Sequence, residues 1–293
     1  MTTPHGRLSV NQATLKYATL PEALDATAGA GITSIGLWRD AVHAQSLPEA
    51  ARLLAASGLR FSSLCRGGFF TVPEGASRRA AMDDNRKAIE EAATLAAAGA
   101  AGSTPVLVMV AGGLPQGSKD LAGARAGVQD ALAELAPEAL ASGVTLALEP
   151  LHPMYVSDRA VISTLKQALD LASPFSRAAV GVVIDTFHVW WDPDLPAQIA
   201  RAGAEGRIAS YQVCDWATPL AADVLLSRHY PGAGVIDFEA ITTAVQAAGY
   251  AGDVEVEIFN QDIWDTPPAE VVARTIGSFD DYVAAHLGAG LRR

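Results

Sequence analysis

The sequence predicts a (β/α)8 barrel, in which eight parallel strands alternate with helices and close into a ring. Strand-like and helix-like segments alternate along the whole chain, which indicates a parallel α/β sheet. Eight strand-like segments can be counted. Four of those in the C-terminal half carry an oxygen-bearing side chain at or near their C-terminal ends, at intervals of 36, 27 and 45 residues. A barrel of about 250 residues has roughly 30 residues per βα unit and carries its functional groups at the C-terminal strand ends.

Short apolar runs mark the strands, and alanine-rich segments mark the helices between them. The expected strands cover residues 8–11, 32–37, 59–65, 105–111, 144–149, 180–185, 208–214 and 254–258. The expected helices include residues 21–30, 48–57, 74–98, 119–142, 158–172, 237–248 and 268–287. Gly58, Gly143 and Gly249 follow three of these helices, where a left-handed C-cap residue is needed. No segment resembles a linker, so we expect a single domain over residues 1–293.

The overall composition favours a soluble, cytoplasmic protein. A net charge of −11 without a Lys/Arg cluster argues against a nucleic-acid partner. Two cysteines are too few for a disulfide framework, and no signal-peptide pattern opens the sequence. The uncharged run 92–114 is long enough to raise the question of a membrane span. Its first part is alanine-rich, its last part has a β-type composition, and Gly, Ser, Thr and Pro separate the two. We therefore interpret the run as a helix end, a turn and a strand, and we expect no membrane partner.

The four oxygen-bearing residues are the most informative feature of the chain. They are Glu149 in VTLALEP, Asp185 in VGVVIDTFH, Gln212 in IASYQVCD and Glu257 in DVEVEIFN. Burying an acid at a strand end is costly unless the site needs the charge. Neighbouring strands of a barrel bring their C-terminal ends together, so we expect the four side chains to meet.

The alternation of side chains along each strand places these residues on one side of the barrel wall. Glu149 shares its strand face with Thr145 and Ala147, whereas positions 144, 146 and 148 carry Val, Leu and Leu. The strands of Asp185 and Gln212 show the same division. We therefore expect these three side chains in the lumen and the larger apolar ones against the helices. Glu257 shares a face with Glu255 and lies nearer the C-terminal strand end, so it is the preferred candidate of the two.

Three carboxylates and one amide would form an oxygen-rich ligand set, which favours Mg²⁺ or Mn²⁺ over Zn²⁺. Buried acids cannot all remain ionised beside one another without a cation. We therefore predict a divalent metal bound by Glu149, Asp185, Gln212 and Glu257. The alternative is that each acid separately forms a salt bridge or caps a helix.

Four further residues are candidates for substrate binding. His188 follows Asp185 by three residues, His152 follows Glu149 by three, and Arg228 lies in the glycine-containing segment RHYPGAG. A guanidinium there could bind a carboxylate or another substrate oxygen through two hydrogen bonds. Trp38 ends the second expected strand and could form a wall of the pocket. The alternatives are structural histidines, a surface arginine and an aromatic cap on the barrel mouth.

At these residues the chain resembles the xylose isomerase-like TIM-barrel superfamily, also called the AP endonuclease family 2 fold. The resemblance is clearest in VTLALEPLHP, VVIDTFHVWW, YQVCDW, RHYPGAGVIDF and VEVEIFN. Sugar isomerases and epimerases of this group bind a divalent metal through Glu, Asp, His and Glu, which implies the same ligand set here, with Gln212 in place of the commoner His. Members resembling hydroxypyruvate isomerase also carry Gln at this position. The resemblance further implies that His188 contacts a substrate oxygen.

The activity implied by the resemblance is a metal-dependent isomerase or epimerase of a sugar, a polyol-derived ketose or a hydroxy-keto acid. Glu149 and Glu257 would transfer a proton through an ene-diolate. A lyase or dehydratase on a keto sugar or cyclic polyol and a non-catalytic metabolite-binding barrel remain open alternatives. A DNA-repair endonuclease would need more metal-binding histidines than the six in this chain supply. Relatives in this superfamily are often dimers or tetramers, so a homo-oligomer is also an open expectation.

Overall fold

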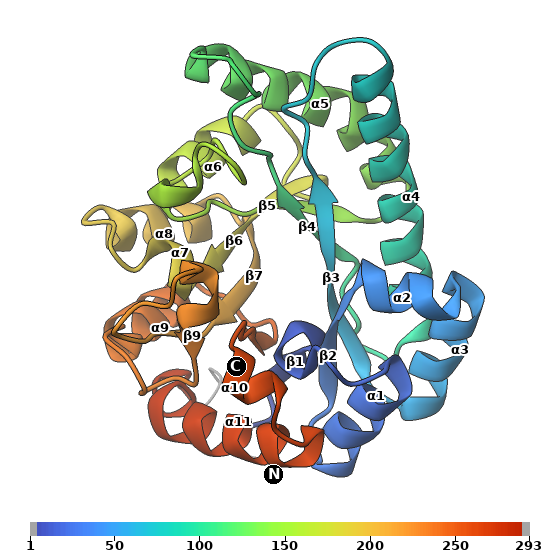
Figure 1. The fold of residues 1–293 in the computed structure, drawn as a ribbon, viewed down its shortest axis with the longest axis vertical. Coiled ribbons are helices and arrows are strands. Elements are labelled where there is room, and N and C mark those ends of the chain that lie inside the picture. Colours follow the sequence, from blue (N-terminus) through green and yellow to red (C-terminus); the bar gives the residue numbers. More distant parts are fainter. Residues whose placement is uncertain (1–4, 289–293) are drawn as a thin grey trace.

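The computed structural model describes residues 5–288, and its strands form a closed parallel barrel (Figure 1). The barrel strands are β1 (Leu8–Asn11), β2 (Ser34–Trp38), β3 (Arg60–Gly68), β4 (Val106–Val110), β5 (Thr145–Leu148), β6 (Val180–Asp185), β7 (Ile208–Val213) and β10 (Val254–Val256). They follow the order β1-β10-β7-β6-β5-β4-β3-β2 around the ring. A separate two-stranded antiparallel ribbon joins β8 (Asp215–Trp216) to β9 (Arg228–His229). The predicted (β/α)8 fold is therefore confirmed.

The helices surround the barrel, as Figure 1 shows. They are α1 (Leu20–Gly29), α2 (Arg39–Gln45), α3 (Leu47–Ser57), α4 (Ala76–Ala98), α5 (Leu121–Ala141), α6 (Leu165–Ala172), α7 (Thr186–Val189), α8 (Leu195–Ala204), α9 (Phe238–Ala247), α10 (Gln261–Trp264) and α11 (Pro268–Tyr282). Short 3-10 helices cover Gln12–Leu15, Pro153–Tyr155, Val224–Ser227 and Ala284–His286. Within residues 5–288, no helix combines the length and hydrophobicity needed to cross a bilayer.

Most expected elements agree with the structure to within a few residues, but the helix predicted over residues 158–172 begins only at Leu165. Thr164 has an extended backbone, and its side chain accepts a hydrogen bond from the N–H of Gln167, so it is the N-cap. The preceding segment instead forms turns and a parallel bridge between Ala160 and Gly112. This tertiary pairing competes with helix formation, and no local pattern reveals it.

The predicted alternation of side chains along the strands is also confirmed. The large apolar residues, such as Leu146, Leu148 and Ile184, pack in the main core with residues from the helices. A second, smaller group of apolar residues fills the barrel lumen and consists of Cys65, Val106, Val108, Ala147 and Val183. The face expected to carry Glu149 and Asp185 is thus the lumen face, and the lumen is packed rather than open.

Gly36 on β2 lies against the buried carboxyl group of Glu255. A Cβ atom there would overlap the carboxyl group of Glu255. We expect Gly36→Ala to lower the free energy of unfolding by about 1–3 kcal/mol, because the buried carboxylate must move. Gly127→Ala on α5 is the control, since its Cβ would meet no atom within 4 Å; it should raise stability by about 0.5–1 kcal/mol. Urea unfolding measures both, and a Gly36→Ala protein as stable as the wild type would show that Glu255 is not held in place.

Candidate functional site

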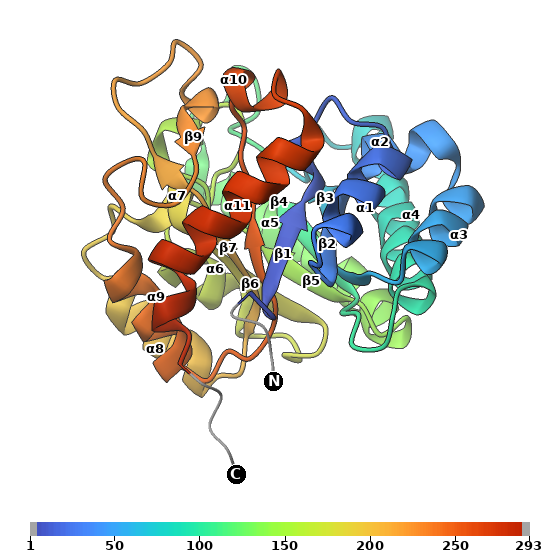
Figure 2. The same ribbon diagram turned by 90° about the horizontal axis from the view of Figure 1, so that it is seen from below.

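A cavity of about 350 Å³ opens at the C-terminal ends of the barrel strands, the end at which β9 and α10 lie (Figure 2). This is the end at which barrels of this kind carry their functional groups. Its walls combine carboxylates, cations and aromatic rings. The main lining residues are Trp38, Cys65, Arg66, Phe69, Glu149, Tyr155, Arg159, His188, Arg228, Glu257 and Phe259.

Glu149 and Glu257 each follow directly after a barrel strand, and a backbone hydrogen bond to the neighbouring strand anchors each of them. The N–H of Glu149 donates to Met109 O at 3.1 Å, and the N–H of Glu257 donates to Val213 O at 3.2 Å. Both side chains are buried but line the cavity. Burial raises the pKa of Glu149 well above its ordinary value, and the nearby Asp185 and Glu257 raise it further. Burial likewise raises the pKa of Glu257 to about 8, although Arg228 opposes this shift.

Asp185 is fully buried at the last position of β6 and caps the short helix α7. Its Oδ1 accepts a hydrogen bond from the N–H of Phe187 at 2.8 Å. This cap turns the chain so that His188 faces back toward the strand ends, with its Nε2 3.9 Å from Asp185 Oδ2. Burial holds the pKa of His188 well below its ordinary value, so the imidazole is neutral. Donor atoms of Glu149, Asp185 and His188 all lie within 4.8 Å of one another.

Arg228 reaches into this group from β9, and its guanidinium is buried between two of the carboxylates. Its Nη1 lies 2.9 Å from Asp185 Oδ2 and 3.3 Å from Glu257 Oε2. Its Nη2 lies 2.9 Å from His188 Nε2. Burial disfavours the charged guanidinium, but the neighbouring carboxylates outweigh this effect and raise the pKa of Arg228. Arg228 is therefore a permanent positive charge at the centre of the site and not the surface arginine considered as the alternative.

The segment that carries Arg228 is held by Asp215 on β8. The carboxylate of this buried residue accepts hydrogen bonds from four backbone N–H groups, those of Trp216, Gly232, Gly234 and Ile236, at 2.8–3.0 Å. Gly234 leaves no room for a Cβ atom beside Asp215 and Trp216. The aspartate of the QVCDW segment therefore has a structural function, because it fixes the loop that delivers Arg228.

Gln212 and Glu255 form a buried polar pair below the cavity. Gln212 Nε2 donates to Glu255 Oε1 at 3.0 Å, and Glu255 also accepts from Asn11, Ser62 and Ser63. This contact determines which way the amide points, and it leaves Gln212 Oε1 buried without a hydrogen-bond partner among residues 5–288. Glu255 and Glu257 thus both enter the lumen, but of these two only Glu257 lines the cavity at the C-terminal strand ends.

The donor set fits a divalent cation. Gln212 Oε1 is buried and has no hydrogen-bond donor among residues 5–288, whereas the buried Asp185 Oδ2 has Arg228 Nη1 at 2.9 Å as its charged neighbour. Their strands are paired in register, with Asp185 opposite Gln212. Three buried carboxylates share the single positive charge of Arg228, and the Gln212 oxygen has no partner, so the group is costly unless a further cation binds there. Carboxylate and amide oxygens are groups that a divalent cation can bind.

The other predicted site residues fall in different places. Trp38 lines the cavity, and its Nε1 donates to Asn11 Oδ1 at 2.7 Å. His152 is not among the lining residues; its ring packs against Trp216 with a centroid distance of 5.1 Å. Its backbone N–H lies 3.2 Å from His188 Nδ1, so its contact with the site is through His188.

Several lining residues were not predicted from the sequence as site residues, among them Arg66, Tyr155, Arg159 and Phe259. Arg66 and Phe259 follow expected strands directly, so their position at a strand end was an available signal. Tyr155 and Arg159 lie in the segment that was expected to be partly helical, and only the folded connection brings them to the cavity.

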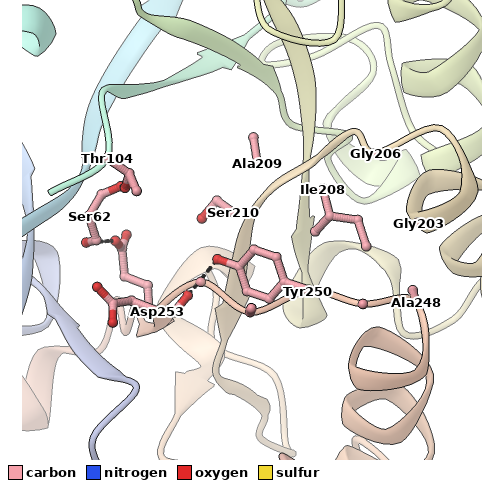
Figure 3. A pocket seen from close by; sticks show the side chains of 14 residues that line it. Ser62, Thr104, Gly203, Gly206, Ile208, Ala209, Ser210, Ala248, Tyr250 and Asp253 are labelled. Carbon is pink, nitrogen blue, oxygen red and sulfur yellow. Dashed lines mark hydrogen bonds between the residues drawn. The ribbon is translucent and has the colours of Figure 1, made fainter. Parts of the chain in front are cut away.

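A second cavity, of about 370 Å³, lies at the opposite, N-terminal end of the barrel (Figure 3). Ser62, Ser210, Tyr250 and Asp253 surround it, and Glu255 forms part of its wall. The hydroxyl of Tyr250 donates to Asp253 O, and the Asp253 carboxylate is paired with Arg60. Its lining contains no basic side chain, histidine or unsatisfied polar atom among the residues described. The reactive groups are therefore concentrated at the C-terminal end.

The eight strands form a closed barrel, and carboxylates at the C-terminal strand ends line one cavity. These features are typical of (β/α)8-barrel proteins, whose functional site lies at the C-terminal face. The chain belongs to the xylose isomerase-like TIM barrel family, whose model matches residues 24–282. The resemblance seen in the sequence is thereby confirmed.

Two curated relatives are enzymes. The chain is 31% identical over 254 residues to a 3-dehydroshikimate dehydratase of Pseudomonas aeruginosa, a match that covers 85% of the chain and 37% of the relative. It is 28% identical over 160 residues to an inosose isomerase of Bacillus subtilis, a match that covers 54% of the chain and 55% of the relative. The matches thus span about half or less of these relatives' own lengths.

Two solved structures share the fold. Protein SMc04130 from Sinorhizobium meliloti 1021 is 46% identical with a TM-score of 0.89, over 94% of this chain and 98% of that one. The IolI protein, solved with a bound zinc atom, is 22% identical with a TM-score of 0.81, over 96% of this chain and 99% of that one. Because the sequence identity to IolI is only 22%, this similarity shows a shared fold alone.

Proposed function

We propose that the chain is a divalent-metal-dependent isomerase or epimerase of a sugar, a polyol-derived ketose or a hydroxy-keto acid. The observation that carries this proposal is the meeting of Glu149 and Glu257 in one cavity. Their strands, β5 and β10, are separated by β6 and β7 around the ring, so the two carboxylates enter from different sides. Two such groups can remove a proton from one carbon atom and return it at a neighbouring carbon or on the opposite face.

The metal in this proposal is Mn²⁺ or Mg²⁺, held by Glu149, Asp185, Gln212 and Glu257. The unsatisfied oxygen of Gln212 and the excess of buried carboxylates over the one charge of Arg228 support this assignment. His188 lies close enough to Glu149 and Asp185 to be a further donor. When bound, a divalent cation would polarise the substrate carbonyl and stabilise the negative charge that develops on its oxygen.

The remaining residues position the substrate. Arg228 and His188 line the cavity and would bind substrate oxygens. Trp38 and Phe259 pack edge to face with a centroid distance of 5.5 Å and form an apolar wall that excludes water from the reacting carbons. Glu149 would take the proton from carbon and Glu257 would return it, or the reverse.

A dehydratase is the second candidate, because the 31% identity to the Pseudomonas aeruginosa dehydratase extends over 85% of this chain. The first step would be the same removal of a proton next to a carbonyl group. The two reactions differ only afterwards, when a dehydratase expels a β-hydroxyl group as water.

An assay in D₂O separates these possibilities. The protein would be incubated with L-ribulose, an inosose, hydroxypyruvate and 3-dehydroshikimate, each with Mn²⁺ or Mg²⁺, and followed by NMR and mass spectrometry. Deuterium incorporated into an isomerised product supports the first proposal, and a product lighter by one water supports the second. Neither turnover nor deuterium incorporation with any compound would contradict both.

A further inference from the structure

The cavity contains a cation that the proposed chemistry does not use. Arg66 on β3 lines the same cavity as Glu149 and Glu257. Its guanidinium forms no hydrogen bond or ion pair with any residue in the range 5–288. The guanidinium instead stacks on the Phe69 ring, with Cζ 4.2 Å from the ring centroid. The planar face is therefore supported and the N–H edge is free.

The other two arginines of the cavity already have anionic neighbours. Arg228 lies between Asp185 and Glu257. Arg159 lies 3.6 Å from Asp158 and 4.0 Å from Asp223. Arg66 is thus the lining cation left without a carboxylate within ion-pairing distance in the described chain. An arginine held partly buried without an anion is unfavourable for the free protein and favours an anionic ligand.

A comparison with Arg39 shows what a half-buried arginine does when it is paired. The hydrogen bonds of Arg39 to Asp84 and Glu91 outweigh the effect of its burial and raise its pKa. Burial lowers the pKa of Arg66, and no hydrogen bond opposes the change. Phe69, which supports Arg66, has a φ of 54° and is 37% exposed. A left-handed backbone is unfavourable for a non-glycine residue, so the aromatic support is maintained against a local penalty.

We propose that Arg66 binds a carboxylate group of the substrate, so that the substrate class is a carboxylate-bearing carbonyl compound rather than a neutral sugar. A carboxylate is planar and presents two oxygens at the spacing of the free guanidinium edge. A phosphate would also pair with a guanidinium, but phosphate sites in proteins commonly add backbone N–H groups of a helix N-terminus or glycine-rich loop. Gly67 and Gly68 do follow Arg66, but the N–H of Gly68 donates to Asn85 Oδ1 at 2.6 Å and that of Phe69 to Val110 O at 2.7 Å, so neither of these two N–H groups is free for a phosphate. The inference rests on the proposed function for the identity of the site, because it places the reacting carbonyl near Glu149 and Glu257.

The experiment is direct binding by calorimetry to the Mn²⁺-loaded protein, which requires no turnover. Three probes are compared: 3-dehydroshikimate, which carries a carboxylate; L-ribulose 5-phosphate, which carries a phosphate; and neutral L-ribulose. The variants are Arg66→Met, which removes the charge and keeps the apolar stem, and Arg66→Lys, which keeps the charge without the planar fork. Arg79→Met, at an exposed position on α4, controls for the loss of one positive charge.

We expect Arg66→Met to weaken binding of the carboxylate probe by about 10–100-fold, the range typical for a charge-assisted pair. Arg66→Lys should restore part of the affinity, and binding of L-ribulose should change less than about twofold. Arg79→Met should behave as the wild type. Equal losses for the carboxylate and neutral probes, a preference for the phosphate probe, or no binding of the carboxylate by the wild type would each overturn the assignment.

The outcome is separable from that of the proposed function. Binding of the carboxylate that depends on Arg66, without any deuterium incorporation, would uphold Arg66 and contradict the catalytic proposal. Turnover of neutral L-ribulose that is unaffected by Arg66→Met would support the catalytic proposal and contradict the role of Arg66.

Discussion

Glu149→Gln and Glu257→Gln are each expected to lower kcat by about 10²–10⁴-fold, the range for removal of a positioned acid or base. Glutamine keeps the size of the side chain and a donor oxygen, but it cannot accept a proton from carbon. Both carboxylates are buried beside Asp185, so the loss of one negative charge should not unfold the protein. Steady-state kinetics on the substrate found in the panel, together with deuterium exchange at its α-carbon, measures the effect.

Glu91→Gln is the matched control for these variants. Glu91 is also a buried glutamate, but it lies on α4 outside the barrel and pairs with Arg39, with 2.6 Å between its Oε2 and Arg39 Nε. We expect its kcat to stay within about twofold of the wild type, whatever the change in stability. Full activity in both Glu149→Gln and Glu257→Gln would show that neither glutamate transfers the proton. Whether the site binds a metal would then be decided by the measurement of Mn²⁺ binding described next.

Asp185→Asn is expected to weaken binding of Mn²⁺ by about 100-fold or more, since even residues that only support metal ligands typically contribute 10–100-fold. The Oδ1 atom can still cap α7, so the variant should retain its fold. In the wild type, Mn²⁺ at about 100 times its Kd should add about 2.7 kcal/mol of stability. That corresponds to a rise in Tm of about 5–10 °C. Calorimetry and thermal unfolding with and without EDTA measure both quantities.

Asp192→Asn is the control for replacing a buried aspartate close to Asp185 in the sequence without removing a proposed metal ligand. Asp192 follows α7, is buried, and accepts from the N–H of Asp194 at 2.9 Å, but it does not line the cavity. Its Mn²⁺-dependent rise in Tm should equal that of the wild type. A wild-type protein whose Tm does not respond to Mn²⁺, Mg²⁺ or chelator would contradict the metal assignment directly.

The barrel was predictable because its signals are local. Side chains alternate with a period of two along a strand, so the division between Leu146 or Leu148 and Ala147 or Glu149 identifies the lumen face before any strand pairing is known. The carboxylates could be placed from the sequence because an ionised group at the end of a buried apolar strand is costly unless a site requires it. His188 and Arg228 were also recognised as site candidates from their positions after those strands.

Long-range contacts decided the rest. The sequence shows Arg228 in a loop, but three hydrogen bonds from Gly232, Gly234 and Ile236 to Asp215 hold that loop so that the guanidinium lies between Asp185 and Glu257. The direction of the Gln212 amide depends on Glu255, which is 43 residues away. Contacts of this kind leave no periodic pattern, because they join residues whose separation along the chain is arbitrary. In the same way, only the tertiary structure shows that Arg66 faces the cavity with its N–H edge free.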